Sequence, residues 1–195
     1  MLKGEDKSEE GYAYSNLGNC YLRLGEFRKA LKYHELHLET AKEMGDRDGQ
    51  GCAYSHLGSC YYRLGNLKRA IDYDEISLKI AQEAGDRAAE GRAYGNLGAI
   101  YESLGDFQKA LDYQERNLVI AKEVGNKIGE GLAYSNLGNV YQDLGMFSRA
   151  TEYYQRHRNI VKEVGDKAGE GLAHHNLGNA YCNTGDFRML QVTTN

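Results

Sequence analysis

The sequence is defined first by what it lacks. It has no proline, and its apolar runs extend over only a few residues, so it offers no membrane-spanning segment and no apolar core of a signal peptide. A basic excess is also missing, because 24 Lys and Arg stand against 28 Asp and Glu. That balance argues against a basic surface for nucleic acid or an anionic membrane. The polar start, MLKGEDKSEE, is unlike a secretory or mitochondrial leader, so we expect a cytoplasmic location.

Signatures of catalysis and of cofactor binding are missing as well. The 24 glycines form no phosphate-binding loop or dinucleotide fingerprint, and no nucleophile elbow, H-E-x-x-H or kinase motif occurs. The four cysteines show no C-x-x-C spacing, and Cys20 and Cys60 share a repeat position with Ile100, Val140 and Ala180. These two thiols are therefore expected to be small core side chains. We predict that the chain is not an enzyme and binds no cofactor.

What the sequence has instead is a period of 40 residues. The stretch 91–126, shifted by one period in either direction, aligns with the chain without a gap. A Gly-x-Ala-Tyr element begins at Gly11, Gly51, Gly91 and Gly131, and survives as Gly-Leu-Ala-His at Gly171. A fixed period of roughly 20 to 50 residues is typical of repeat architectures. The function of such an array is a property of its surface.

Each 40-residue unit carries two helical patterns. In the second copy Leu57 and Tyr61 mark one face at near-helical spacing, and Gly65-Asn66 then ends the helix. The connections are two or three residues long, so the two helices must be antiparallel neighbours. A second glycine follows the core leucine inside each first helix, at Gly18, Gly58, Gly98, Gly138 and Gly178. We expect it to permit a close crossing of the small residues Ala30, Ala70, Ala110 and Ala150 on the second helix.

The phase of the period predicts the domain boundaries. We expect an N-terminal tail at 1–5, a repeat array at 6–190 and a truncated end at 191–195, with repeats near 6–45, 46–85, 86–125, 126–165 and an incomplete one at 166–190. No polar capping helix follows the last first helix, although terminal repeats of a solenoid normally need one. We therefore interpret the chain as part of a longer array. Its Leu177 and Tyr181 face is expected to be under-covered and able to associate end to end.

The repeated residues resemble the tetratricopeptide repeat (TPR) consensus. The resemblance spans residues 6 to about 190 and rests on Leu17-Gly18-Asn19, Tyr21, Gly25, Phe27, Ala30 and Tyr33 and their later copies. The long period and the linking G-D-(K/R)-x-x-E-G are similar to the repeats of Pins-type spindle-orientation adaptors, kinesin light chains and large multi-TPR scaffold proteins. The resemblance implies an all-α fold, a right-handed TPR superhelix (alpha solenoid) of antiparallel helix pairs with about four and a half repeats. It also implies an inner wall of first helices that binds an extended or helical peptide.

By this resemblance, the inward positions of the first helices carry two rows of asparagine. The first row is Asn16, Asn96, Asn136 and Asn176, with His56 in the second copy, and the second row is Asn19, Asn139 and Asn179. Asparagine amides donate and accept hydrogen bonds, so they can hold a peptide backbone whatever its side chains. Nothing in the fold demands an asparagine there, and its helix propensity is mediocre, which favours ligand contact. The alternative is drift on a solvated face.

Basic residues make an acidic ligand a further hypothesis. In the spindle-type adaptors an arginine before Ala-Tyr helps to hold acidic peptides, and Arg92 occupies that position here. The other copies replace it with Tyr12, Cys52, Leu132 and Leu172. Arg23 and Arg63 add positive charge in the first two repeats, whereas Glu102 and Asp143 stand at the matching position, or beside it, further along.

Two histidines are candidate metal ligands. His34 and His37 are three residues apart and could share an ion. No third or fourth ligand is evident from the sequence, and the same repeat positions hold Asp74 and Ser77 in the next copy. We therefore expect a packed or surface pair and no metal site.

Together these patterns predict a non-catalytic scaffold or adaptor that binds a partner peptide in a groove. One alternative is a structural spacer or self-assembling fragment of a larger multi-TPR protein, which would show end-to-end association and no groove ligand. Another is an RNA-binding helical repeat, which would need a basic groove and base-reading side chains. The acidic charge balance argues against it.

Overall fold

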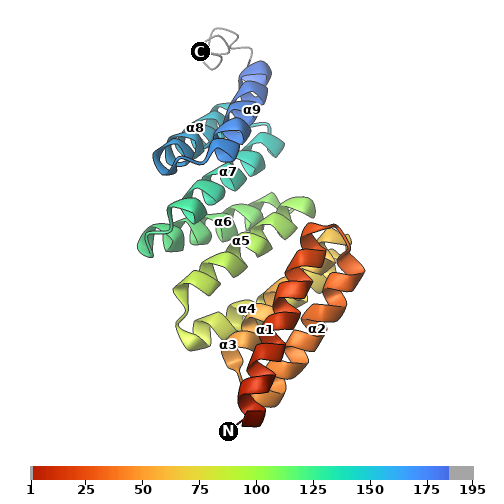
Figure 1. The fold of residues 1–195 in the computed structure, drawn as a ribbon. Helices are drawn as coiled ribbons and strands as arrows, with labels where there is room; N and C mark the ends of the chain where they lie inside the picture. The colour runs from red at the N-terminus through yellow and green to blue at the C-terminus, as the bar shows by residue number, and fades with distance from the viewer. Residues whose placement is uncertain (1, 185–195) are drawn as a thin grey trace. The chain divides into compact units, whose positions relative to one another are not determined.

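Helical hairpins follow the 40-residue period along the chain (Figure 1). The computed structural model describes the backbone of residues 2–184 and the side chains of residues 7–183. The helices of this part are α1 (Leu2–Arg23), α2 (Phe27–Met44), α3 (Arg47–Arg63), α4 (Leu67–Ala84), α5 (Arg87–Ser103), α6 (Phe107–Glu123), α7 (Lys127–Asp143), α8 (Phe147–Val164) and α9 (Lys167–Thr184). Because every element there is a helix, the all-α repeat fold is confirmed. None of these helices is both long and apolar enough to cross a membrane.

The chain divides into two compact units, residues 1–100 and 101–195, and the boundary falls within α5. In the first unit α1 packs on α2, α2 on α3, and α3 on α4. In the second unit α6 packs on α7, α7 on α8, and α8 on α9. In each of these pairs the two helices are neighbours in sequence, as the short connections require.

Glycine and a capping side chain set the helix ends. Gly45 ends α2 in the left-handed conformation (φ 68°), which costs a residue without a Cβ little. Asp46 then begins α3, because its carboxylate accepts a hydrogen bond from the Gly49 N–H at 2.9 Å. Asn66 and Asn126 cap α4 and α7 in the same way. The predicted Gly-Asx punctuation is confirmed at these ends.

The first helix begins earlier than expected. A tail was predicted at residues 1–5, but α1 already starts at Leu2. No proline stands before Asp6 to stop the helix. Lys7 ties this end to α2 through an ion pair with Glu43 at 2.6 Å. The same pair recurs one period later between Arg47 and Glu83.

The glycine inside the first helix faces a different partner from the predicted alanine. A Cβ at Gly138 would lie 2.5 Å from Cε1 of Tyr154, and one at Gly18 would lie 2.6 Å from Nδ1 of His34. A Cβ at Gly58 would lie 2.8 Å from Cγ of Asp74. The alanines are buried as expected. The glycine is needed, however, because the side chain four residues after each alanine fills the space beside it.

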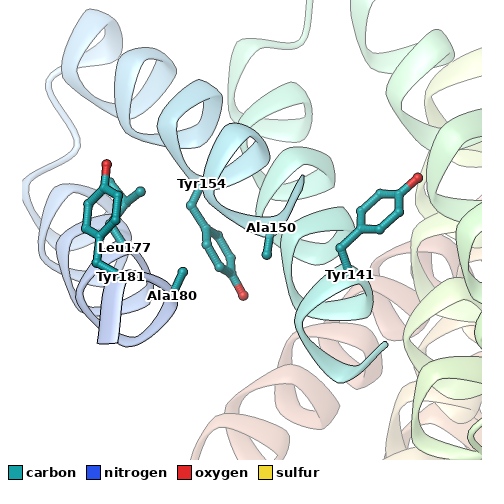
Figure 2. Close-up of a cluster of buried hydrophobic side chains, with 6 residues drawn as sticks. All are labelled: Tyr141, Ala150, Tyr154, Leu177, Ala180 and Tyr181. Atoms are coloured by element: carbon teal, nitrogen blue, oxygen red, sulfur yellow. The ribbon is translucent and has the colours of Figure 1, made fainter. Parts of the chain in front are cut away.

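The predicted exposed face at the C-terminal end is wrong. Leu177 and Tyr181 are 0% and 5% exposed, and they pack with Tyr154 and Ala180 in the cluster that Figure 2 shows. The reason is that the core leucine of a first helix faces the preceding repeat. The predicted truncated end at 191–195, and residues 185–190 of the fifth repeat, lie outside the described residues.

The core leucine that is exposed lies on α1, at the N-terminal end of the array, and not on α9. Leu17 is 41% exposed, whereas its counterpart Leu57 is 1% exposed and packs with Leu38 of α2. Cys20 is likewise exposed, while Cys60 is fully buried. The prediction of a core thiol is thus confirmed for Cys60 and wrong for Cys20, because among the described residues no helix precedes α1.

Candidate functional site

The predicted asparagine rows lie on one face of the first helices in each unit. In the first unit Asn16 on α1 is exposed, while His56 on α3 and Asn96 on α5 are half-buried. In the second unit the half-buried Asn136 and Asn176 lie on α7 and α9. The second row has half-buried members, Asn19 and Asn139, and an exposed one, Asn179. All of them sit at positions that a ligand could reach.

Part of the first row has a structural role that the sequence did not reveal. The Asn96 amide donates to Oδ1 of Asp74 at 2.9 Å, and the Asn136 amide lies 3.4 Å from Oε1 of Gln114. Each pair joins a second helix to the next first helix, 22 residues later. The expectation that nothing in the fold demands an asparagine here is therefore wrong for Asn96 and Asn136.

The hydrogen-bond partners of these asparagines, which the sequence did not predict, occupy one buried position of the second helices. His34, Asp74, Gln114 and Tyr154 succeed each other there, and each is at most 1% exposed. In the last case the Tyr154 hydroxyl reaches the second row and donates to Oδ1 of Asn139 at 2.8 Å. A buried polar group costs free energy unless it is paired, so these partners hold the amides in place.

Asp74 is the charged member of this buried series. Burial raises its pKa to about 7, and the hydrogen bond from Asn96 only partly opposes the rise. Its second oxygen, Oδ2, has no hydrogen-bond partner among the described residues. The Asp74 carboxyl therefore keeps its proton to a much higher pH than an exposed aspartate does.

The predicted arginines are at the surface of the first unit. Arg23, Arg63 and Arg92 are exposed, and the Arg63 guanidinium lies 5.1 Å from the ring centroid of Phe27. In the second unit, burial and the charge of Asp143 raise the pKa of Glu102 to about 7. The first helices of the first unit thus carry exposed cations, whereas the neutral form of Glu102 is favoured in the second unit.

The second unit contains an apolar pocket. It has a volume of about 230 Å³ and lies between the start of α7, the end of α8 and the start of α9. Ile128, Leu132 and Leu172 line it and are 67%, 54% and 47% exposed. Because residues four apart share a helix face, Leu132 lies beside Asn136 and Leu172 beside Asn176.

The sequence contained a trace of this pocket. Leu132 and Leu172 were noted as substitutes for the arginine of the spindle-type adaptors, and two apolar residues at an expected groove position indicate an apolar contact. The side chains that α8 contributes, such as Ile160 and Val164, could not be assigned to the same surface without the packing of α8 between α7 and α9.

Three histidines come together in the first unit. His34 and His37 of α2 and His56 of α3 each offer a ring nitrogen, and these nitrogens lie within 4.8 Å of one another. The rings of His34 and His56 have centroids 4.6 Å apart. Burial lowers the pKa of His34 to about 3 and that of His56 to about 4, so both rings are neutral at pH 7. The expectation that no third candidate ligand accompanies His34 and His37 is wrong, because His56 of α3 brings a third ring nitrogen to them.

The sequence profile of the tetratricopeptide repeat family matches residues 49–123 and 129–189, and a second profile of that family matches residues 13–48. This chain belongs to the tetratricopeptide repeat family. The TPR fold is generally a non-catalytic protein-interaction module. Among curated protein sequences, none matches this one.

Solved structures agree with the family. BtubC (BKLC) from P. vanneervenii is 26% identical, with a TM-score of 0.85, over 98% of this chain and 81% of its own. A putative kinesin light chain with TPR-like repeats from Podosopora anserina is 16% identical, with a TM-score of 0.74, over 94% and 90%. A Rap protein complexed with competence and sporulation factor is 18% identical, with a TM-score of 0.84, over 94% and 52%. The last two likenesses show the fold alone, and the chain spans about half of the Rap protein.

Proposed function

We propose that this TPR protein is a non-catalytic adaptor whose first-helix face binds a peptide segment of a partner protein. The family supports a protein-interaction role, and a similar fold was solved as a Rap protein complexed with a factor. The observation that carries the proposal is the apolar pocket of the second unit, in which Leu132 and Leu172 stand one helical turn before Asn136 and Asn176. A pocket with neighbouring polar groups is the usual form of a binding site.

In this proposal the pocket provides affinity and the amides provide register. An apolar ligand side chain buried between Leu132 and Leu172 contributes about 1.5–3 kcal/mol. Each hydrogen bond from an asparagine to the ligand backbone adds roughly 1 kcal/mol. Asn136 and Asn139 are already held by Gln114 and Tyr154, so little rotamer freedom is lost when the ligand binds.

The first unit adds charge to its own face. Arg23, Arg63 and Arg92 are exposed there and favour acidic residues in the ligand. Exposed ion pairs contribute only about 0–1 kcal/mol each, so these arginines select among ligands more than they strengthen binding. We therefore expect acidic residues in a ligand of the first unit and an aromatic or aliphatic anchor in a ligand of the second.

Two alternative functions, a self-assembling spacer and an RNA-binding protein, have less support. The self-assembling spacer depended on an open Leu177 and Tyr181 face, and both side chains are buried. An RNA-binding role depends on a basic groove, and the formal net charge is −4. The cytoplasmic location stays a prediction.

The test is a peptide-display selection on the full chain, followed by titration of the enriched peptide. Asn176→Ala is the informative variant, because Asn176 has no hydrogen-bond partner among the described residues and its removal strands no buried group. Asn159→Ala is the matched control, since Asn159 is exposed on the second helix α8. We expect Asn176→Ala to weaken the peptide by about tenfold, the equivalent of one hydrogen bond to the ligand, and Asn159→Ala to leave it unchanged. No enriched peptide, or equal binding by Asn176→Ala, would refute the proposal.

A further inference from the structure

The three histidines of the first unit form a cluster that peptide binding does not explain. His34 is 0% exposed, and neither of its ring nitrogens has a hydrogen-bond partner among the described residues. Nδ1 of His37, which is 7% exposed, is also without a partner. A buried nitrogen without a partner is destabilising, and such groups are rare in folded proteins. Three of them in one place, next to His56, point to a ligand that is held there.

The placement of the rings suits a metal ion. His34 and His37 are three residues apart on α2, so they project from one face of that helix. His56 reaches the same point from α3, and one nitrogen of each residue lies within 4.8 Å of the others. Around a tetrahedral zinc ion the nitrogens stand about 3.3 Å apart. Rotation of the imidazoles about their side-chain bonds can provide a movement of this size.

We infer that His34, His37 and His56 bind a zinc ion that links the first repeat to the second. Imidazole nitrogen suits Zn²⁺ and is a poor ligand for Mg²⁺ or Ca²⁺, which prefer oxygen. Three histidines leave one tetrahedral position for water. Because His56 is only half-buried, that position lies toward the first-helix face, from which the ion enters.

Gly18 leaves the space that the ring of His34 occupies. The ring of His34 lies where a Cβ of residue 18 would stand, with Nδ1 and Nε2 each 2.6 Å from that point. Other copies of the repeat put Asp74 or Tyr154 against the equivalent glycine, so no imidazole fills that space there, although His157 stands at the position of His37 in the copy that contains Tyr154. The zinc site is therefore specific to the first two repeats.

The repeat itself supplies the variants for a test. Asparagine stands at the position of His56 in the other four copies, so His56→Asn removes a ligand with a side chain that the fold accepts. Serine stands at the position of His37 in the second copy, as Ser77. The matched control is His157→Ser, because the buried His157 occupies the same repeat position as His37 and lies outside the cluster.

The experiment titrates Zn²⁺ alone into the full chain after chelator treatment, by calorimetry, and follows the melting temperature. We expect one ion per chain and a rise in melting temperature with zinc and not with Mg²⁺. His56→Asn and His37→Ser should each weaken zinc binding by at least about tenfold, the low end of what loss of even an outer partner costs. His157→Ser should bind zinc like the wild type.

Cobalt gives a second readout that does not depend on stability. Co²⁺ in the wild-type site should show the visible absorption of a tetrahedral complex, and His56→Asn should lose it. The inference is overturned if the wild type binds no zinc, if His56→Asn binds it equally well, or if His157→Ser weakens it as much as His37→Ser. The adaptor function is tested by a peptide and so fails or stands separately.

Discussion

The two glycines Gly138 and Gly171 allow one chemical change with opposite expected effects. Both lie within first helices, where alanine is favoured over glycine by about 1 kcal/mol. At Gly171 an added Cβ would meet no atom within 4 Å among the described residues beyond its own stretch of helix, so Gly171→Ala should stabilise the protein by roughly that amount. At Gly138 the added Cβ would lie 2.5, 2.6 and 3.0 Å from three carbons of the Tyr154 ring. Those contacts must open by about 1 Å to reach normal separation.

Tyr154 cannot move without cost. Tyr154 is 1% exposed and packs with Ala150 and Ala180 (Figure 2). Its hydroxyl donates a hydrogen bond to Asn139. Overpacking of such a core costs about 1–3 kcal/mol, and this site belongs at the upper end. After the gain in helix propensity, Gly138→Ala should destabilise the protein by about 1–2 kcal/mol. The two variants should then differ by roughly 2–3 kcal/mol.

Urea unfolding followed by circular dichroism measures both variants, and a double-mutant cycle identifies the cause. Tyr154→Ala alone should cost about 3–5 kcal/mol. In the double variant the methyl group at position 138 occupies part of the vacated space, so the loss should be smaller than the sum of the two changes. If Gly138→Ala is as stable as the wild type, or if the two losses simply add, the glycine has no role in admitting Tyr154.

Two further predictions concern Asp74 and the leucine core. The pKa of Asp74 is about 7 in the folded protein and 3.8 in the reference state, so its burial costs nothing below pH 4 and reaches its full cost above pH 7. The stabilisation by Asp74→Asn should therefore increase with pH between those limits, to at most about 4 kcal/mol. Urea unfolding at pH 5 and at pH 8 measures it. If the free energy difference between the variant and the wild type does not change with pH, the folded protein keeps the carboxyl ionised. Leu97→Ala should cost about 2–5 kcal/mol, because Leu97 is 0% exposed. The same change at the 41%-exposed Leu17 should cost well under half as much in the same assay, and equal losses would mean that the core face is assigned wrongly.

The features that recur with the period were predictable from the sequence. The glycine of Gly65-Asn66 recurs in every copy and a capping residue follows it at Asn66 and Asp106, so local propensity and repetition agree there. The buried polar position was not predictable, because His34, Asp74 and Gln114 share no pattern from copy to copy. Its partners stand 22 residues later on the next repeat, a pairing that depends on how a second helix packs on the following first helix.

The same limit explains the histidine cluster and the pocket. His56 is as far from His34 as Asn96 is from Asp74, and only the packing of α2 on α3 brings its ring to the pair. The pocket takes its lining from three helices, and Leu132 and Leu172 were visible in the sequence as isolated substitutions. The sequence indicated single residues of the histidine cluster and of the pocket, and only the packing of the helices shows that they lie together.

Nuclear magnetic resonance with labelled methyl groups tests the proposed binding face most directly. With the selected peptide bound to the full chain, intermolecular contacts are expected at the methyl groups of Ile128, Leu132 and Leu172. Val119, which is 62% exposed on the second helix α6, serves as the internal comparison and should show none. Contacts at Val119, with unchanged spectra at Leu132 and Leu172, would contradict peptide binding on the first-helix face.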